Sequence, residues 1–315
     1  MYGARRRRVL LGSLLALLLA VTAFAAPRQQ PNDRAPARRQ GSHAQQVRTY
    51  LPPVRWPLRG QAALVLGDGL PAASPREQPA PIASLAKVMT AYLTLEHYPL
   101  SGAQDGFTIT ASESQAHAEA QGQSVVAVQA GEQLTERQLL EALLIPSGNN
   151  IARMLATTVA GSETSFIAEM NAEAGALGME HTIYTDPSGF DPSTVSTAAD
   201  QLRVFRRAMR FPVFRQIVSM ASVTLPVAGT LTNFNPLIAD GYAGKTGSDS
   251  AAGGCLAFFT HVTMGGQELT AVGVVMGQGQ GSDTSTILAA AGEAATQLVE
   301  SVAPASRHRS RSAQN

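Results

Sequence analysis

The sequence predicts an α+β fold, in which an antiparallel sheet is flanked by helices and joined to a helical lobe. Three observations support this prediction. One apolar strand pattern lies early in the chain, at residues 61–66, and two more lie late, at 254–262 and 269–276. The long segment between them has mainly helical periodicity, and an alanine-rich helical pattern at 283–302 follows the last strand. This order indicates a sheet covered by helices and a helical insertion, with a cleft between the two.

The early strand and the first helix are both strongly apolar. Residues 61–66 (Gln-Ala-Ala-Leu-Val-Leu) run into a Gly-Asp-Gly turn, which is typical of a buried strand. A proline-rich stretch then leads to residues 82–93, where apolar side chains occupy nearly every face of a helix. A helix that is apolar all round is buried, so we expect this one at the centre of the domain.

The helical middle is marked by its start signals. A Thr-Glu-Arg-Gln capping box at 135–138 opens one helix, and helical periodicity resumes over 151–159. Between them, a Pro-Ser-Gly-Asn-Asn segment predicts a turn whose Ser147 and Asn149 side chains point into the cleft. A Thr-Ala-Ala-Asp segment at 197–200 marks the start of another helix.

The late strands form a predicted hairpin, because Gly265 and Gly266 separate two hydrophobic runs. A Lys-Thr-Gly segment at 245–247 comes before the first of these strands.

Composition excludes several classes of function. A net charge of +1 over 315 residues argues against an electrostatic nucleic-acid binder, and much of the basic charge is terminal. Cys255 is the only cysteine, so no internal disulfide or Cys-x-x-Cys pair exists. The six histidines show no close-spaced ligand pattern. We expect no metal and no cofactor.

The N-terminus has the pattern of a targeting segment. Four arginines at 5–8 precede an apolar run, so residues 1–26 are expected to be a cleaved signal peptide or a retained membrane anchor. Residues 27–55 are rich in Gln, Arg, Pro and Ser and predict a disordered linker, and residues 303–315 predict a disordered basic tail. Everything after the leader is therefore expected outside the cytoplasm, with the membrane reached only through that leader.

The chain contains only two lysines, Lys87 and Lys245, against 22 arginines. Arginine stays protonated at any relevant pH, whereas a desolvated lysine can lose its proton and act as a base. Lys87 follows Ser84 by three residues, which places both side chains on one face of a helical turn. Such a pair supplies a nucleophile and a base within reach of each other.

Three short motifs occur in a defined order. They are Ser-x-x-Lys at 84–87, Ser-x-Asn at 147–149 and Lys-Thr-Gly at 245–247. Each motif alone is common, because helices often place Ser and Lys three apart and turns favour Ser and Asn. Their conjunction is specific, and it is a known signature of penicillin-binding proteins and class A β-lactamases.

The chain resembles the serine D-alanyl-D-alanine carboxypeptidases, which are low-molecular-mass penicillin-binding proteins. The resemblance extends to Asp-Pro-Ser-Gly-Phe-Asp at 186–191 and Ala-Ala-Gly-Gly-Cys at 251–255. Ala86 departs from it, since the family often has threonine before the motif lysine. The resemblance implies a penicillin-binding-protein/β-lactamase-like fold for a catalytic domain at 56–302.

The resemblance also implies roles for individual residues in an acyl-enzyme mechanism. Ser84 is the expected nucleophile, Lys87 the base, and Ser147 a relay that protonates the leaving D-alanine. Lys245 and Thr246 are expected to attract the substrate carboxylate, and the backbone N–H groups of Ser84 and Ser248 to form the oxyanion hole. The expected substrate-binding residues are Asn149, Lys245, Thr246, Gly247 and Ser248.

The implied activity is removal of the terminal D-alanine from peptidoglycan stem peptides, with β-lactam antibiotics as inhibitors. A DD-endopeptidase acting on cross-links remains an alternative. A β-lactamase is another, although Glu163, Glu169 and Glu173 form no Glu-x-x-Leu-Asn segment and Glu169 is interpreted as an ordinary exposed helix residue. A non-catalytic protein that binds peptidoglycan or β-lactams is expected to have lost a motif residue, and none is missing here.

Overall fold

The computed structural model describes residues 53–116, 122–279, 281 and 283–303. The expected leader 1–26, nearly all of the linker 27–55 and the tail beyond residue 303 lie outside these described residues. Within the described ranges, no helix has the length and apolarity needed to cross a membrane.

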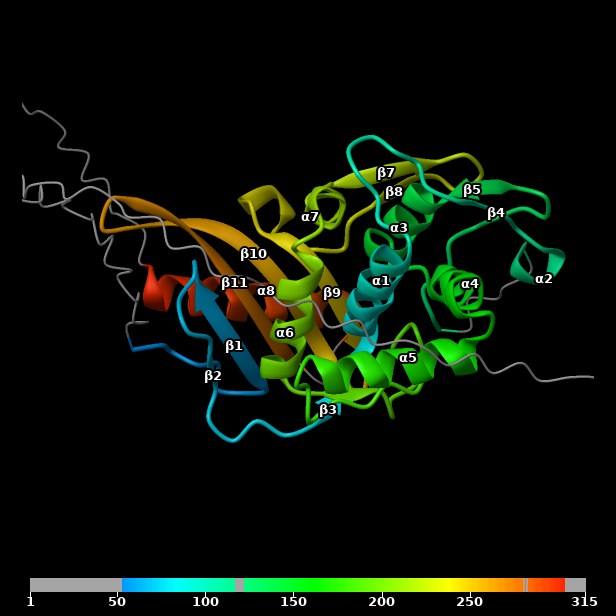
Figure 1. The fold of residues 1–315 in the computed structure, drawn as a ribbon. Helices are drawn as coiled ribbons and strands as arrows, with labels where there is room; N and C mark the ends of the chain where they lie inside the picture. Colours follow the sequence, from blue (N-terminus) through cyan, green and yellow to red (C-terminus); the bar gives the residue numbers. More distant parts are fainter. Residues whose placement is uncertain (1–52, 117–121, 280, 282, 304–315) are drawn as a thin grey trace, which may run out of the picture. The chain divides into compact units, whose positions relative to one another are not determined.

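A five-stranded antiparallel sheet joins the early strand to the late hairpin in the order β2-β1-β11-β10-β9 (Figure 1). In its register, Gln61 lies opposite Met276 and Leu66 opposite Ala271. The sheet therefore brings together segments that are more than 200 residues apart in the chain, as the strand pattern predicts. The strands are β1 Gln61–Leu66, β2 Ala72–Ala73, β9 Ala243–Asp249, β10 Gly253–Met264 and β11 Gln267–Gln278.

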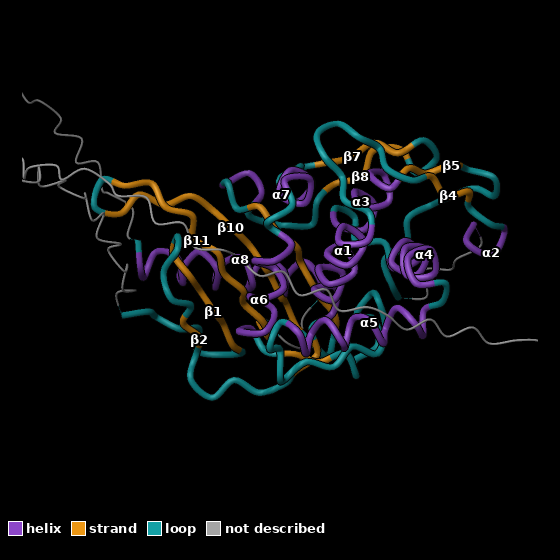
Figure 2. The backbone as a smooth tube through the Cα atoms, in the orientation of Figure 1, coloured by secondary structure: helices purple, strands orange, loops and turns teal. Residues whose placement is uncertain are grey.

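Helices cover both faces of the sheet, and this explains why β1 is apolar throughout. Ala62 and Leu64 alternate with Ala63 and Val65 between two separate hydrophobic clusters, because successive strand side chains point to opposite faces. The helix α8, Thr284–Val302, packs on one face. The other face contacts α6, Ala198–Ala208, which Figures 1 and 2 show on the opposite side of the sheet from α8.

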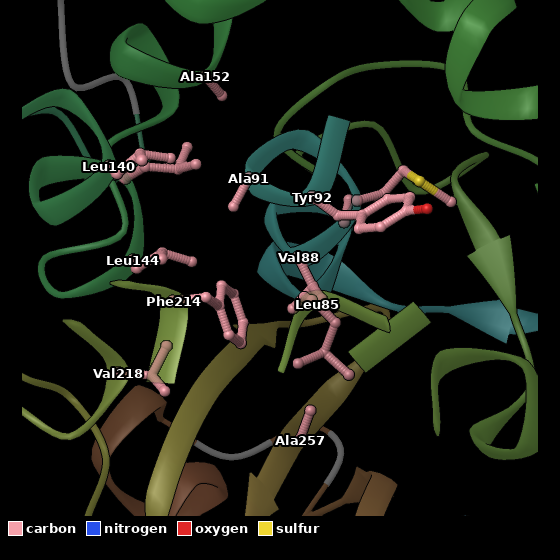
Figure 3. Close-up of a cluster of buried hydrophobic side chains, with 14 of the residues drawn as sticks. Leu85, Val88, Ala91, Tyr92, Leu140, Leu144, Ala152, Phe214, Val218 and Ala257 are labelled. Carbon is pink, nitrogen blue, oxygen red and sulfur yellow. The ribbon is translucent and has the colours of Figure 1, made fainter. Parts of the chain in front are cut away.

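The helical lobe is built around α1, as predicted for a helix that is apolar on all faces. Residues 86–95 of α1 are all buried. Figure 3 shows side chains of α3, α4, α7 and β10 arranged around it, with Leu140 and Ala152 among the labelled residues. The helices of this lobe are α1 Ala86–His97, α2 Glu113–Ala116, α3 Glu136–Leu144, α4 Asn149–Ala160, α5 Glu163–Ala176 and α7 Pro212–Val218.

The helix start signals are confirmed. Thr135 Oγ1 accepts a hydrogen bond from the Gln138 backbone N–H at 3.3 Å, and Gln138 Oε1 accepts one from the Thr135 backbone N–H at 2.9 Å, so the capping box is complete. Thr197 caps α6 with its side chain alone, which accepts from the Asp200 backbone N–H at 3.2 Å. The described part of the chain also contains three two-stranded ribbons and a 3-10 turn, Ile238–Asp240. The ribbons pair β3 Ala80–Pro81 with β6 Val195–Ser196, β4 Thr108–Thr110 with β5 Gln133–Thr135, and β7 Ser222–Leu225 with β8 Gly229–Thr232.

Three local expectations are corrected. Lys245-Thr246-Gly247 precedes the strand at 254–262 as predicted, but it also forms part of an edge strand of its own, β9, where Lys245 pairs with Ala257. Asn149 is the first residue of α4 and not part of the turn, with its backbone N–H bound to Ser124 O at 2.8 Å. Ser84 lies in a 3-10 turn just before α1. Tertiary contacts decide these boundaries, which local propensity does not determine.

Candidate active site

Ser84 lies in a tight turn that presents its hydroxyl at the start of α1. The turn, Ala83–Leu85, is a single 3-10 turn, and Ala83 has a left-handed φ of +45° that a non-glycine residue adopts only at a cost. Ser84 remains partly exposed although its neighbours on both sides are buried. The turn therefore holds an accessible hydroxyl on an otherwise buried segment.

Lys87 is fully buried directly beneath Ser84. Its Nζ lies 2.7 Å from Ser84 Oγ, 2.6 Å from Asn149 Oδ1 and 2.9 Å from the carbonyl oxygen of Ser188. Burial lowers the pKa of Lys87 well below its ordinary value, the charge of Lys245 lowers it further, and the carboxylate of Asp186 opposes the shift in part. The amine is therefore favoured in its neutral form.

The three partners determine what a neutral Lys87 can do. An uncharged amine has two hydrogens and one lone pair. Asn149 Oδ1 and the Ser188 carbonyl are both acceptors, so they take the two hydrogens. The lone pair then faces Ser84 Oγ, which can donate its own proton at the observed 2.7 Å. The arrangement is that of a base aimed at a nucleophile.

The loop at 186–191 supplies the Ser188 carbonyl, and Asp186 organises this loop. The Asp186 carboxylate accepts backbone N–H groups from Ser188 at 2.9 Å, from Gly189, and from Asp191 at 2.7 Å. A Cβ at Gly189, where φ is +76°, would lie 1.8 Å from the carbonyl oxygen of Ala83. Glycine is thus required for the loop to pack against the nucleophile turn.

A second pair, Ser147 and Lys245, lies beside the first. Lys245 is fully buried, and its Nζ donates to Ser147 Oγ at 2.9 Å and to the Thr246 carbonyl at 2.8 Å. Burial lowers the pKa of Lys245 to about 7. Ser147 has a left-handed φ of +65°, so its backbone, like that of Ala83, is strained at the site.

Gly247 allows β9 to approach the nucleophile turn closely. A Cβ at this position would lie 2.8 Å from Ile82 O and 3.2 Å from the backbone nitrogens of Ser84 and Leu85. The 2.8 Å contact with a backbone oxygen is closer than real Cβ atoms come, so a side chain at the third residue of the Lys-Thr-Gly motif would force β9 and the turn apart. The glycine brings the strand that carries Lys245 against the turn that carries Ser84.

The structure thus brings the three motifs together, although not every predicted residue is equally engaged. Hydrogen bonds link Ser84, Lys87 and Asn149 in one group. Ser147 and Lys245 form the other. The side chains of Thr246, which is buried, and Ser248, which is partly exposed, make no hydrogen bond within the described part of the chain. Their predicted roles toward a substrate remain predictions.

Two further polar residues adjoin the site and were not found from the sequence. Gln123 Oε1 accepts from Asn149 Nδ2 at 3.1 Å and from Arg153 Nη2 at 2.8 Å. Arg153 lies four residues after Asn149 on α4, so helical spacing places both on one face and offered a signal. Gln123 lies in a polar loop segment that carries no such signal.

None of the three glutamates that follow Ser147 forms a hydrogen bond with Ser84 or Lys87 in the described part. Glu169 lies in α5 and is partly buried, not fully exposed as predicted, and its carboxylate is paired with His97 at 3.0 Å. Glu173 accepts a hydrogen bond from Tyr92 Oη at 3.0 Å. Burial raises the pKa of Glu163, and the charge of Arg153 opposes this shift.

Comparisons with known proteins identify the family to which the chain is similar. The family model described as D-alanyl-D-alanine carboxypeptidase matches residues 71–279. The D-alanyl-D-alanine carboxypeptidase DacB2 of Mycobacterium tuberculosis is 39% identical over 46% of this chain and 48% of its own length. A D-alanyl-D-alanine endopeptidase of Pseudomonas aeruginosa is 36% identical over 43% of this chain and 42% of its own length. The matched segment thus spans about half or less of these curated relatives.

Solved structures match a larger share of the chain. The Streptomyces K15 DD-transpeptidase aligns with a TM-score of 0.66 at 26% identity, covering 79% of this chain and 98% of the other. A penicillin-binding protein homologue from M. tuberculosis aligns with a TM-score of 0.63 at 30% identity, covering 79% and 95%. The predicted α+β fold of the penicillin-binding-protein type is therefore confirmed.

Proposed function

The chain belongs to the D-alanyl-D-alanine carboxypeptidase family, and we propose on this basis that it is a serine-type D-Ala-D-Ala carboxypeptidase. In this proposal it removes the terminal D-alanine from peptidoglycan stem peptides and is inhibited by β-lactams. The observation that carries the proposal is the position of Lys87 Nζ, 2.7 Å from Ser84 Oγ with two carbonyl acceptors on its other sides.

The proposed reaction begins with attack by Ser84 Oγ on the carbonyl carbon of the D-Ala-D-Ala peptide bond. The hydroxyl proton passes to the lone pair of Lys87, which burial and the nearby Lys245 charge favour as a neutral amine. The peptide C–N bond then breaks, and the departing amine of D-alanine receives a proton. Water hydrolyses the Ser84 ester, releases the shortened peptide and restores the hydroxyl.

Ser147 and Lys245 are the proposed residues for protonating the leaving group. Ser147 Oγ accepts from Lys245 Nζ, so its own hydrogen is free to be directed at a departing amine. A substrate carboxylate near Lys245 would favour the charged form of this lysine, whose pKa of about 7 permits either state near neutral pH. Thr246, Gly247 and Ser248 on the same strand are the proposed contacts for the rest of that terminus.

A DD-endopeptidase remains the second candidate, because a relative bearing that name matches this chain at 36% identity. Both reactions use the same acyl-enzyme and differ in the leaving group, which is free D-alanine or a cross-linked peptide. A β-lactamase is less well supported, since Glu169 and Glu173 are engaged with His97 and Tyr92 and not with the site. We also propose an extracytoplasmic location, on the basis of the leader pattern at 1–26.

The proposal is tested by measuring the intact mass of the protein after incubation with benzylpenicillin, with Ser84→Ala as the matched control. A lasting adduct on the wild type alone supports the acyl-enzyme on Ser84. Release of D-alanine from a pentapeptide, compared with cleavage of a cross-linked dimer, then separates carboxypeptidase from endopeptidase. An unmodified wild type that has hydrolysed the penicillin would instead indicate a β-lactamase.

A further inference from the structure

We propose that Gln123 and Arg153 are positioning residues that hold the side-chain amide of Asn149 in one orientation, with its oxygen toward Lys87. The inference rests on the proposed role of Lys87 as the base. It assigns a function to two side chains that lie outside the three motifs. Both reach the site from the α4 side, Arg153 from the helix itself and Gln123 from the segment that precedes β5.

Arg153 sets the orientation of the side-chain amides of Gln123 and Asn149. Arginine has hydrogen-bond donors and no acceptor, so the Gln123 atom that faces Arg153 Nη2 at 2.8 Å must be the oxygen. That same oxygen receives Asn149 Nδ2 at 3.1 Å. Asn149 must then present its Oδ1 to Lys87, at 2.6 Å. Arg153, which can only donate, thus fixes the orientation of the Gln123 amide and, through it, that of the Asn149 amide.

The orientation of Asn149 decides whether Lys87 can act as a base. With Oδ1 toward Lys87, the amide takes one of the hydrogens of the neutral amine, and the lone pair is left for Ser84. A flipped amide would present Nδ2 instead and compete with Ser84 for that lone pair. Asn149 is 4% exposed, so water has little access to form the hydrogen bonds that a flipped amide would lack. The hydrogen bonds of Gln123 with Arg153 and Asn149 disfavour the flipped orientation of the Asn149 amide.

Arg153 also contributes its charge. The charged groups that act on Lys87 are Lys245 from β9, Asp186 from the loop at 186–191 and Arg153 from α4. The cations lower the pKa of Lys87 and Asp186 raises it, while burial is the largest cause of its low value. Removing Arg153 therefore has two separable effects, a disordered Asn149 amide and a higher pKa for Lys87.

The test is the rate of acylation by benzylpenicillin, followed by intact mass across a range of pH. Gln123→Ala and Arg153→Met are each expected to lower this rate about 5- to 10-fold, the effect of one lost hydrogen bond. Arg153→Lys, which restores a donor-only cation, is expected to recover much of the loss. Arg203→Met, on α6 with a largely exposed side chain, is the matched control and should keep the wild-type rate.

Two readouts separate positioning from a structural role. In an Asn149→Ala background, Gln123→Ala should cause no further loss, because the residue acts through the Asn149 amide. The acid limb of the pH profile should move to higher pH in Arg153→Met and stay in place in Gln123→Ala, since only the former removes a charge. Thermal midpoints check that each variant is folded.

The outcomes distinguish the inference from the proposed function. A wild type that forms no adduct would overturn the proposed function and this inference with it. A normally acylated wild type with Gln123→Ala at the same rate would overturn the inference alone. So would an equal loss from Gln123→Ala in the wild-type and Asn149→Ala backgrounds, because the residue would then act by another route.

Discussion

Lys87 and Glu136 are both buried ionisable residues, and they lie near opposite ends of α1. Lys87 is in its first turn, whereas Glu136 helps to line a surface pocket of about 560 Å³ with His97 to Leu100. Burial opposes the charge on each, lowering the pKa of Lys87 and raising that of Glu136 to about 7. Burial therefore shifts the equilibrium of each group toward its neutral form.

Their hydrogen bonding differs. Every neighbour of Lys87 Nζ is placed so that the neutral amine keeps one lone pair for Ser84. Glu136 Oε1 has no hydrogen-bond partner among the described residues. The comparison shows that burial alone produces a neutral group, while a base also needs neighbours that direct its lone pair. We expect substitutions of Lys87 to change the activity and substitutions of Glu136 to change the stability.

The largest expected effect is that of Lys87→Met, which replaces the amine with an apolar chain of similar length. We expect the rate of acylation by benzylpenicillin to fall about 10²- to 10⁴-fold, because the base is lost. The measurement is adduct formation by intact mass over time. A variant that stays folded and is acylated at the wild-type rate would show that Ser84 is activated by another group.

Gly247→Ala should have the next largest effect. The added Cβ would lie 2.8 Å from Ile82 O, so β9 must move away from the nucleophile turn. A displacement of this kind can cost about 100-fold in acylation rate. Gly175→Ala in α5 is the control, because a Cβ at this position meets nothing within 4 Å. We expect this variant to keep full activity and to gain slightly in thermal midpoint, since alanine favours a helix more than glycine does.

Lys245→Gln tests the coupling between the two lysines. Removing the Lys245 charge should raise the pKa of Lys87, so the acid limb of the acylation profile moves to higher pH. The direction follows because Lys87 acts as a base only above its own pKa. An unchanged acid limb would mean that the charge of Lys245 does not influence Lys87.

The smallest effect is expected from Glu136→Gln, on stability alone. A carboxyl whose pKa is raised from 4.5 to about 7 contributes stability below pH 4.5 that is lost as the pH rises through 7. The variant should match the wild type near pH 4 and exceed it by about 1–2 kcal/mol above pH 7. Glu293→Gln, on the exposed side of α8, serves as the control in the same denaturant titrations. Equal pH profiles for Glu136→Gln and wild type would contradict a neutral Glu136.

The sequence predicted the parts of the site that depend on short-range spacing. Ser84 and Lys87 are three residues apart, so one helical turn suffices to bring them together. The sequence did not indicate that the Lys-Thr-Gly segment is itself a strand, because its glycines and lysine have little strand propensity. It forms β9 only because β10 and the Ser84 turn hold it from two sides.

Gln123 and Asp186 show what spacing could not predict. Gln123 reaches Asn149 across 26 residues, from a polar segment with no periodicity. Asp186 lies in a segment recognised by resemblance, but its role comes from the three backbone N–H groups that it binds. Both roles depend on tertiary contacts that only the folded chain defines.

The most direct test uses the rarity of lysine in this chain. With only two lysines present, labelling with ¹³Cε-lysine gives two side-chain resonances, and Lys87→Met assigns them. We expect the Lys87 signal to be that of a neutral amine at neutral pH, and the Lys245 signal to titrate near pH 7. Two signals that remain charged until their ordinary pKa of 10.5 would contradict the account, because Lys87 could not then take the Ser84 proton.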